Sequence, residues 1–185
     1  MSATAAGTQL LSLPAEFLPA VRRALAHGRD PLDAAVLLRQ VGYETGESFH
    51  TALEEWLARE GAAAPGGLPP EEFWSAFGRF WESLGWGSVR HVQLHPGVAA
   101  LDCEGWTEAD SAGYTGQAAC HLTTGVLADL LGRVAGSGVA VMEVECRSAG
   151  DGRCRFLFGG EAALGEVYRG MTEGLSYSDA LSRLG

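Results

Sequence analysis

The spacing of hydrophobic positions divides the chain into a helical first part and a second part that mixes strands and helices. Up to residue 84, apolar side chains recur every three or four residues, which is the period of a helix with one buried face. Beyond Gly85 the period changes, and short apolar or alternating runs predict strands. The pattern therefore favours a structure built from both kinds of element.

Three helices are expected in the first part, over residues 13–26, 31–60 and 71–84. Asp30 and Pro31 provide an N-cap followed by proline at the first helical position. Gly42 and Gly46 interrupt the apolar pattern of the second helix. They permit either a break in that helix or its close packing against another helix.

Four strands are expected in the second part, over residues 89–94, 98–106, 139–147 and 154–158. A short turn rich in Gly joins the two strands of each pair. A helix over 117–135 separates the pairs, and helices over 161–172 and 178–184 close the chain. Local strand pairs separated by a helix predict an α+β fold, with a mostly antiparallel sheet of about four strands and helices packed on one face.

The length of 185 residues fits a single domain. Residues 1–12 read as a flexible tail and residues 13–60 as an N-terminal helical part. Residues 61–70, which are rich in Ala, Gly and Pro, read as a linker to the α+β part over 71–185. The start of the chain lacks the pattern of a secretory signal, and we expect a cytoplasmic protein.

Charge argues against several classes of partner. The net charge is −10 and the basic residues form no run, whereas nucleic-acid binding needs clustered cations. Binding to an acidic membrane surface is disfavoured for the same reason. No stretch approaches the roughly 18–20 apolar residues of a membrane span. We therefore expect neither nucleic acid nor membrane as a partner.

Signatures of catalysis are missing from the sequence. It contains no P-loop, no His-Glu-x-x-His and no Gly-x-Ser-x-Gly. Binding is thus favoured over catalysis.

Four cysteines carry the most specific chemical signal: Cys103, Cys120, Cys146 and Cys154. Cys146 and Cys154 flank a tight turn between two predicted strands, and Cys120 opens a predicted helix, where the helix dipole favours a thiolate. In a cytoplasmic protein, spaced cysteines more often bind metal or react than form disulfides. The alternative is that they are small buried residues.

Two segments around these cysteines resemble the 4-vinyl reductase domain family. They read Cys-His-x-Thr-x-Gly from Cys120, and Glu-x-Glu-Cys-Arg-x-x-Gly-Asp-x-x-Cys-Arg-Phe from Glu143. The resemblance is close over about residues 85–160 and looser over 31–60. The family includes sensor domains of phenol- and xylene-responsive transcription activators, and subunits of the TRAPP transport complex share its fold.

The resemblance implies a set of metal ligands, because the phenol-sensing relatives hold zinc with three Cys and one Glu. The matching residues are Cys120, Glu143, Cys146 and Cys154. Four protein ligands would close the coordination sphere, as in a structural zinc site. In a regular strand, however, Glu143 and Cys146 point to opposite faces. Both can reach one ion only if the strand bulges or ends between them; otherwise Cys103 is the reserve ligand.

The family's sensors bind small aromatic molecules in an apolar cavity, and this chain has residues suited to one. The candidates for a pocket are Phe73, Phe77, Phe80, Trp81 and Trp106. His91, His95 or Trp106 could orient a hydroxyl group. The alternative is that the aromatic residues form core or a dimer interface.

The leading hypothesis is a module that binds or senses a small hydrophobic or aromatic molecule, contains structural zinc and acts through an unknown protein partner. A dimeric adaptor like the TRAPP subunits is the second hypothesis. A reductase or accessory protein acting on tetrapyrroles is the third. The resemblance also implies a homodimer.

Overall fold

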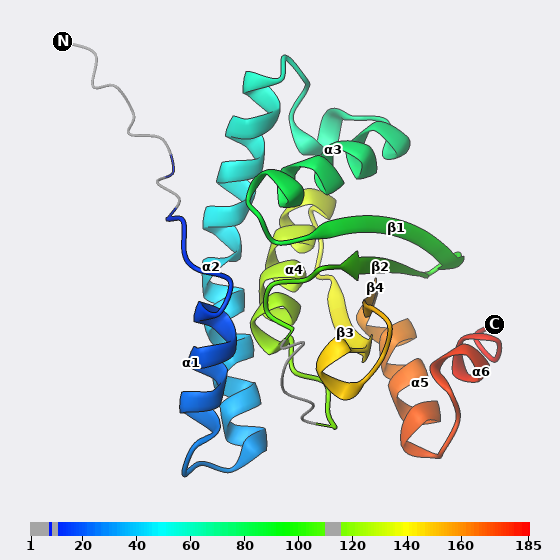
Figure 1. The fold of residues 1–185 in the computed structure, drawn as a ribbon. Coiled ribbons are helices and arrows are strands. Elements are labelled where there is room, and N and C mark those ends of the chain that lie inside the picture. The colour runs from blue at the N-terminus through cyan, green and yellow to red at the C-terminus, as the bar shows by residue number, and fades with distance from the viewer. Residues whose placement is uncertain (1–7, 9–10, 110–115) are drawn as a thin grey trace.

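The computed structural model describes residues 8, 11–109 and 116–185. Its centre is a four-stranded sheet in the order β1-β2-β4-β3, in which all three strand pairs are antiparallel (Figure 1). The strands are β1 (Ser88–His95), β2 (Val98–Glu104), β3 (Ala140–Glu145) and β4 (Cys154–Gly159). The predicted α+β fold and the size of its sheet are confirmed.

The helices follow the predicted order. They are α1 (Phe17–Ala26), α2 (Pro31–Arg59), η1 (Pro65–Gly67), α3 (Pro70–Ser83), α4 (His121–Ala135), η2 (Arg147–Ala149), α5 (Glu161–Thr172) and α6 (Tyr177–Leu181). Asp30 caps α2 by accepting a hydrogen bond from the backbone nitrogen of Leu32 at 2.8 Å. The helix predicted from residue 117 begins at His121, because Cys120 is its N-cap. Most of the predicted tail, residues 1–12, lies outside the described residues.

Helix α2 is continuous through Gly42 and Gly46, so the second of the two expectations for these glycines is correct. A Cβ atom on Gly42 would lie 2.1 Å from the carbonyl oxygen of Leu122, and one on Gly125 would lie 2.1 Å from the carbonyl oxygen of Arg39. Only glycine leaves room for such an approach. The backbones of α2 and α4 are therefore in direct contact.

The sheet is covered on both faces rather than on one. The larger core lies between the sheet and α2, α3 and α4, and Leu101 of β2 belongs to it. The neighbouring Ala100 points to the opposite face, where it packs in a smaller core with Leu164 of α5 and Leu181 of α6 (Figure 1). The expectation of helices on one face therefore holds for α2–α4 and is wrong for α5 and α6.

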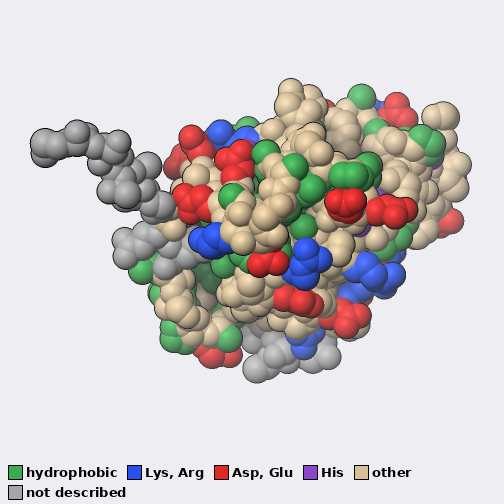
Figure 2. Space-filling model, turned by 90° about the horizontal axis from the view of Figure 1, so that it is seen from above, with side chains coloured by type: hydrophobic (Ala, Val, Ile, Leu, Met, Phe, Trp, Pro, Cys, Tyr) green, Lys and Arg blue, Asp and Glu red, His purple; other side chains and the backbone are tan. Residues whose placement is uncertain are grey.

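The surface shows mixed charge. On the face seen in Figure 2, acidic and basic side chains are interspersed and no broad basic patch forms. None of the helices in the described part of the chain has the length and apolar character needed to cross a membrane.

Candidate metal centre

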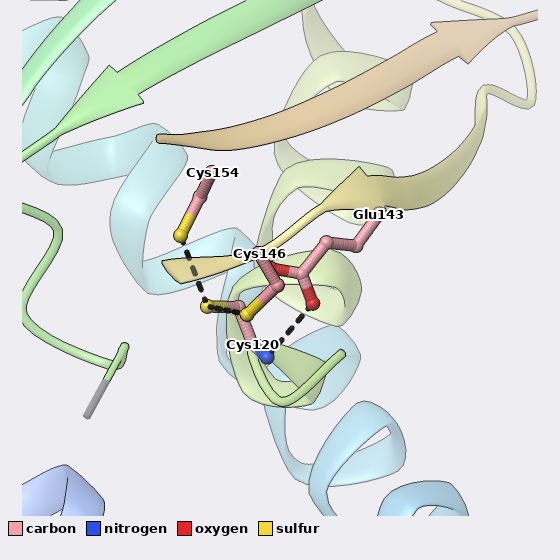
Figure 3. Close-up of side chains that lie close together, drawn as sticks. All are labelled: Cys120, Glu143, Cys146 and Cys154. Carbon is pink, nitrogen blue, oxygen red and sulfur yellow. Dashed lines mark hydrogen bonds between the residues drawn. The ribbon is translucent and has the colours of Figure 1, made fainter. Parts of the chain in front are cut away.

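Three thiols and one carboxylate converge at the start of α4 (Figure 3). Each of Cys120, Glu143, Cys146 and Cys154 offers a ligand atom, and these atoms all lie within 4.8 Å of one another. The Sγ atom of Cys120 is 3.9 Å from that of Cys146 and 3.7 Å from that of Cys154. Sulfur atoms on a zinc tetrahedron with bonds of about 2.3 Å would be about 3.8 Å apart. The spacing therefore fits tetrahedral zinc.

The turn between β3 and β4 positions two of the thiols. Cys146 follows β3 and Cys154 begins β4. The backbone oxygen of Cys146 accepts hydrogen bonds from the amides of Ala149 at 2.8 Å and Asp151 at 3.1 Å. The carboxylate of Asp151 in turn accepts one from the amide of Cys146 at 2.7 Å. This closed turn holds both cysteines against Cys120.

The geometry of β3 allows Glu143 and Cys146 to face the same point. The register with β4 shifts between Glu143 and Glu145, and the strand ends at Glu145. Both conditions that the sequence left open, a bulge and a strand end, are present. Cys103 is buried directly opposite Cys154 in the β2–β4 register, but it is not a member of the ligand group.

The carboxylate of Glu143 divides its two oxygens between two tasks. Its Oε2 accepts hydrogen bonds from the amides of Ala119 at 3.1 Å and Cys120 at 3.0 Å. Its Oε1 is buried and has no hydrogen-bond partner among the described residues. An unpaired buried acceptor is costly, and a bound cation would remove that cost. The donor set and this free oxygen both fit zinc.

The acidic groups of the site oppose one another's ionisation. Burial and the nearby Cys146 thiolate raise the pKa of Glu143 to about 9. Hydrogen bonds to the other two cysteines, together with burial, raise the pKa of Cys120 well above its usual range. Hydrogen bonds from Cys120 and Cys154 lower the pKa of Cys146. Negative charge thus gathers on Cys146, and a divalent cation would allow the other ligands to ionise as well.

A second buried carboxylate, which sequence reasoning missed, supports the same helix start. Glu108 accepts hydrogen bonds from the amides of Leu122 at 2.9 Å and Thr123 at 2.7 Å, and from the Thr123 hydroxyl at 2.6 Å. Its burial outweighs these bonds and raises its pKa to about 7. No spacing in the sequence marks it, because 14 residues separate it from Leu122.

The five residues proposed for a pocket all lie in the larger core. Phe73, Phe77, Phe80, Trp81 and Trp106 are each 6% exposed or less. Trp81 lies at the middle of the cluster, with ring centroids 6.0 Å from Phe77 and 5.5 Å from Trp106. The indole nitrogen of Trp106 donates to the Thr123 hydroxyl at 2.8 Å, whereas that of Trp81 is buried with no hydrogen-bond partner among the described residues.

The histidines considered as ligand anchors have structural contacts. His91 stacks on Trp74 with ring centroids 4.3 Å apart and planes within 6°. His95 accepts a hydrogen bond from the amide of Gly97 at 3.2 Å. Neither contact tests a role in ligand binding, which stays a prediction for both.

A surface groove of about 660 Å³ lies beside the metal centre. Its walls come from α2, the start of α4, strand β3 and α5, and Glu143 is one of its lining residues. Ligand sites commonly measure about 300–1,000 Å³, so the groove is large enough for a small molecule.

Comparison with known proteins adds a family and a fold. Residues 100–159 match the vinyl-4-reductase domain. Curated proteins gave no match. Among solved structures, the phenol-responsive sensory domain of the transcription activator PoxR with phenol has a TM-score of 0.61 and 16% identity, covering 95% of this chain and 85% of that one.

Two further structures are similar. Subunit 3 of the trafficking protein particle complex from Naegleria fowleri, covalently bound to palmitic acid, has a TM-score of 0.60 and 15% identity, covering 78% of this chain and 91% of that one. A vinyl-4-reductase family protein from Methanocaldococcus jannaschii has a TM-score of 0.44 and 15% identity, covering 77% and 91%. The fold of the first two and the match over residues 100–159 confirm the resemblance seen in the motifs: this chain contains a vinyl-4-reductase domain.

Proposed function

We propose that the protein is a binding or sensing module for a small hydrophobic or aromatic molecule, built around a structural zinc ion and acting through a partner protein. The observation that carries the metal part is the convergence of three thiols with Glu143, whose free buried oxygen lacks a hydrogen bond. Four protein ligands leave no coordination position for water or substrate, so zinc would stabilise the fold and would not catalyse a reaction.

The ligand part rests on the fold and on Trp81. The PoxR domain, which shares this fold, is described as phenol-responsive and contains phenol. In this chain the indole N–H of Trp81 is surrounded by aromatic rings and has no acceptor in the described structure. A ligand with one oxygen could accept that hydrogen bond while its apolar body packs on Phe77 and Trp106.

Native mass spectrometry of protein purified from its own host tests the metal and ligand together. We expect one zinc ion per chain and a retained small molecule. The variant C146S should lose the metal, whereas C103S, which changes a buried cysteine outside the ligand group, should keep it. Protein that carries no transition metal after careful purification would overturn the zinc assignment.

Thermal unfolding tests the ligand. Because a ligand that binds only the folded state stabilises it, phenol and related aromatics should raise the melting temperature. The variant W81F keeps the aromatic volume but removes the indole N–H, and it should reduce that rise. If no aromatic compound raises the melting temperature of the wild type, the sensing proposal fails.

A dimeric adaptor is the second candidate, and the outer face of α2 favours it. Five large apolar side chains of this helix are exposed: Leu32, Val36, Leu37, Val41 and Tyr43. Such a face is suited to an interface with a second copy or another protein. Light scattering at several concentrations should give a dimer, and V36E should shift it toward monomer. A monomer at every concentration would exclude this role for a second copy.

A further inference from the structure

The groove beside the metal centre has a chemical character that the aromatic core lacks. Four consecutive residues of β3, Ala140 to Glu143, line it. Because successive strand residues point to opposite faces, a groove that touches all four runs along the edge of the strand. Strand β3 pairs only with β4, so this is an unpaired edge of the sheet.

Helix α5 supplies an apolar wall of the groove. Leu164, Tyr168 and Met171 form this wall, and Met142 of β3 adds to it. Tyr168 is 60% exposed although it is large and apolar apart from its hydroxyl. This wall would gain from contact with an apolar molecule.

Positive charge and an imidazole also line the groove. Arg39 comes from α2 and His121 from the first turn of α4. The guanidinium of Arg39 has no hydrogen-bond or ion-pair partner among residues 8, 11–109 and 116–185. An imidazole carries at least one N–H in either protonation state. The groove therefore offers a hydrogen-bond donor and an available cation.

The carboxylates on the groove wall differ in how they affect this cation. Glu143 is held by the amides of Ala119 and Cys120 and would be neutralised by a metal ion. Glu161 lies in the first turn of α5 and lines the groove from that helix. Neither forms an ion pair with Arg39 in the described structure. The guanidinium is therefore open to an external anion.

We infer that this groove is a second ligand site, distinct from the aromatic core, and that it takes a small apolar carboxylate. The carboxylate would pair with Arg39 and His121, and the apolar body would lie on Met142, Leu164 and Tyr168. Arg suits this task because its planar guanidinium can bind both oxygens of a carboxylate.

The test is a titration of zinc-loaded, isotope-labelled protein with 2-naphthoate and with its neutral analogue 2-naphthylmethanol, followed by amide chemical shifts. We expect naphthoate to shift the amides of His121, Met142 and Tyr168. The variant R39Q should weaken naphthoate binding at least about fivefold and change the binding of the alcohol less than about twofold. R59Q removes a cation from the other end of the same helix and should change neither.

A groove-filling variant gives an independent check. Gly165 lines the groove, and a Cβ at this position meets no atom within 4 Å. G165L should therefore fold normally and block both probes. A162L adds the same side chain on an exposed position of α5 that does not line the groove, and it should leave both probes bound.

The outcomes separate this inference from the proposed function. If naphthoate does not bind, or binds equally to R39Q, R59Q and G165L, the groove site is wrong. A parallel titration with phenol reports on the aromatic core through the Trp81 indole signal. Phenol binding without naphthoate binding overturns only the groove, whereas naphthoate binding without phenol binding supports the groove and counts against the aromatic core as a ligand site.

Discussion

Cys103 and Cys154 are register partners on adjacent strands and are both fully buried, yet only Cys154 belongs to the ligand group. The two residues therefore form a matched pair for separating the loss of a metal ligand from the loss of a buried thiol.

We expect C154S to lower the melting temperature of zinc-loaded protein much more than C103S does. Metal binding in such sites stabilises the folded state directly, and C154S removes one ligand of four. Differential scanning calorimetry with and without a chelator measures both effects. The chelator should lower the melting temperature of C103S and have little effect on C154S; equal responses in the two variants would contradict a metal at this centre.

Glu143 should contribute to zinc affinity through its charge. The variant E143Q keeps the size of the side chain and an oxygen for the amides of Ala119 and Cys120, but it loses the anionic ligand. We expect zinc affinity to fall about tenfold or more, measured by competition with a chromophoric chelator. The control is E145Q: Glu145 contacts Arg153 and Tyr177 instead, and its substitution should leave the affinity unchanged.

Glu108 should make stability depend on pH. Its pKa is raised to about 7 in the folded state from an ordinary value of 4.5. Between these values the folded state retains a proton that the unfolded state has released, so the free energy of unfolding should fall as pH rises through this window. The fall amounts to at most about 3 kcal/mol.

Urea unfolding of zinc-saturated wild type and E108Q between pH 5 and about 8 isolates this contribution. The difference between the two curves should change across the window and level off above pH about 7. Parallel curves would show that Glu108 titrates normally.

Gly125 should tolerate no side chain. In G125A the new methyl group would lie 2.1 Å from the carbonyl oxygen of Arg39, which forces α2 and α4 apart. We expect a loss of at least about 2 kcal/mol in the free energy of unfolding. G165A places the same change on an open helical position and should be neutral or stabilising by up to about 1 kcal/mol. Equal effects in the two variants would show that the helix contact is not tight.

The sequence predicted the elements and their order because apolar periodicity and turn residues act locally. Asp30-Pro31 and the Gly-containing turn before Cys154 mark boundaries that the structure shares. The same signals predicted that Cys146 and Cys154 would meet. The inclusion of Glu143 came from family resemblance, since regular strand geometry alone placed it on the opposite face from Cys146.

Features that depend on long-range packing were harder to predict. Leu164 and Leu181 mark apolar helix faces, but nothing local states which face of the sheet they cover, and α5 and α6 cover the one left bare in the prediction. Glu108 is an ordinary acidic residue in the sequence, and only the fold places it under the start of α4. The glycines of α2 and α4 likewise acquire their meaning only where the two helices meet.

That meeting point has a mechanical consequence. Since Gly42 and Gly125 bring backbone against backbone, no flexible side chain is left at the crossing to absorb a shift of one helix relative to the other. Any displacement of the first turn of α4, where Cys120 and His121 are held, would be passed to α2 as a rigid movement. The exposed residues Val36 and Tyr43 would move with it, so a partner seated on that helix could register events at a site it never touches.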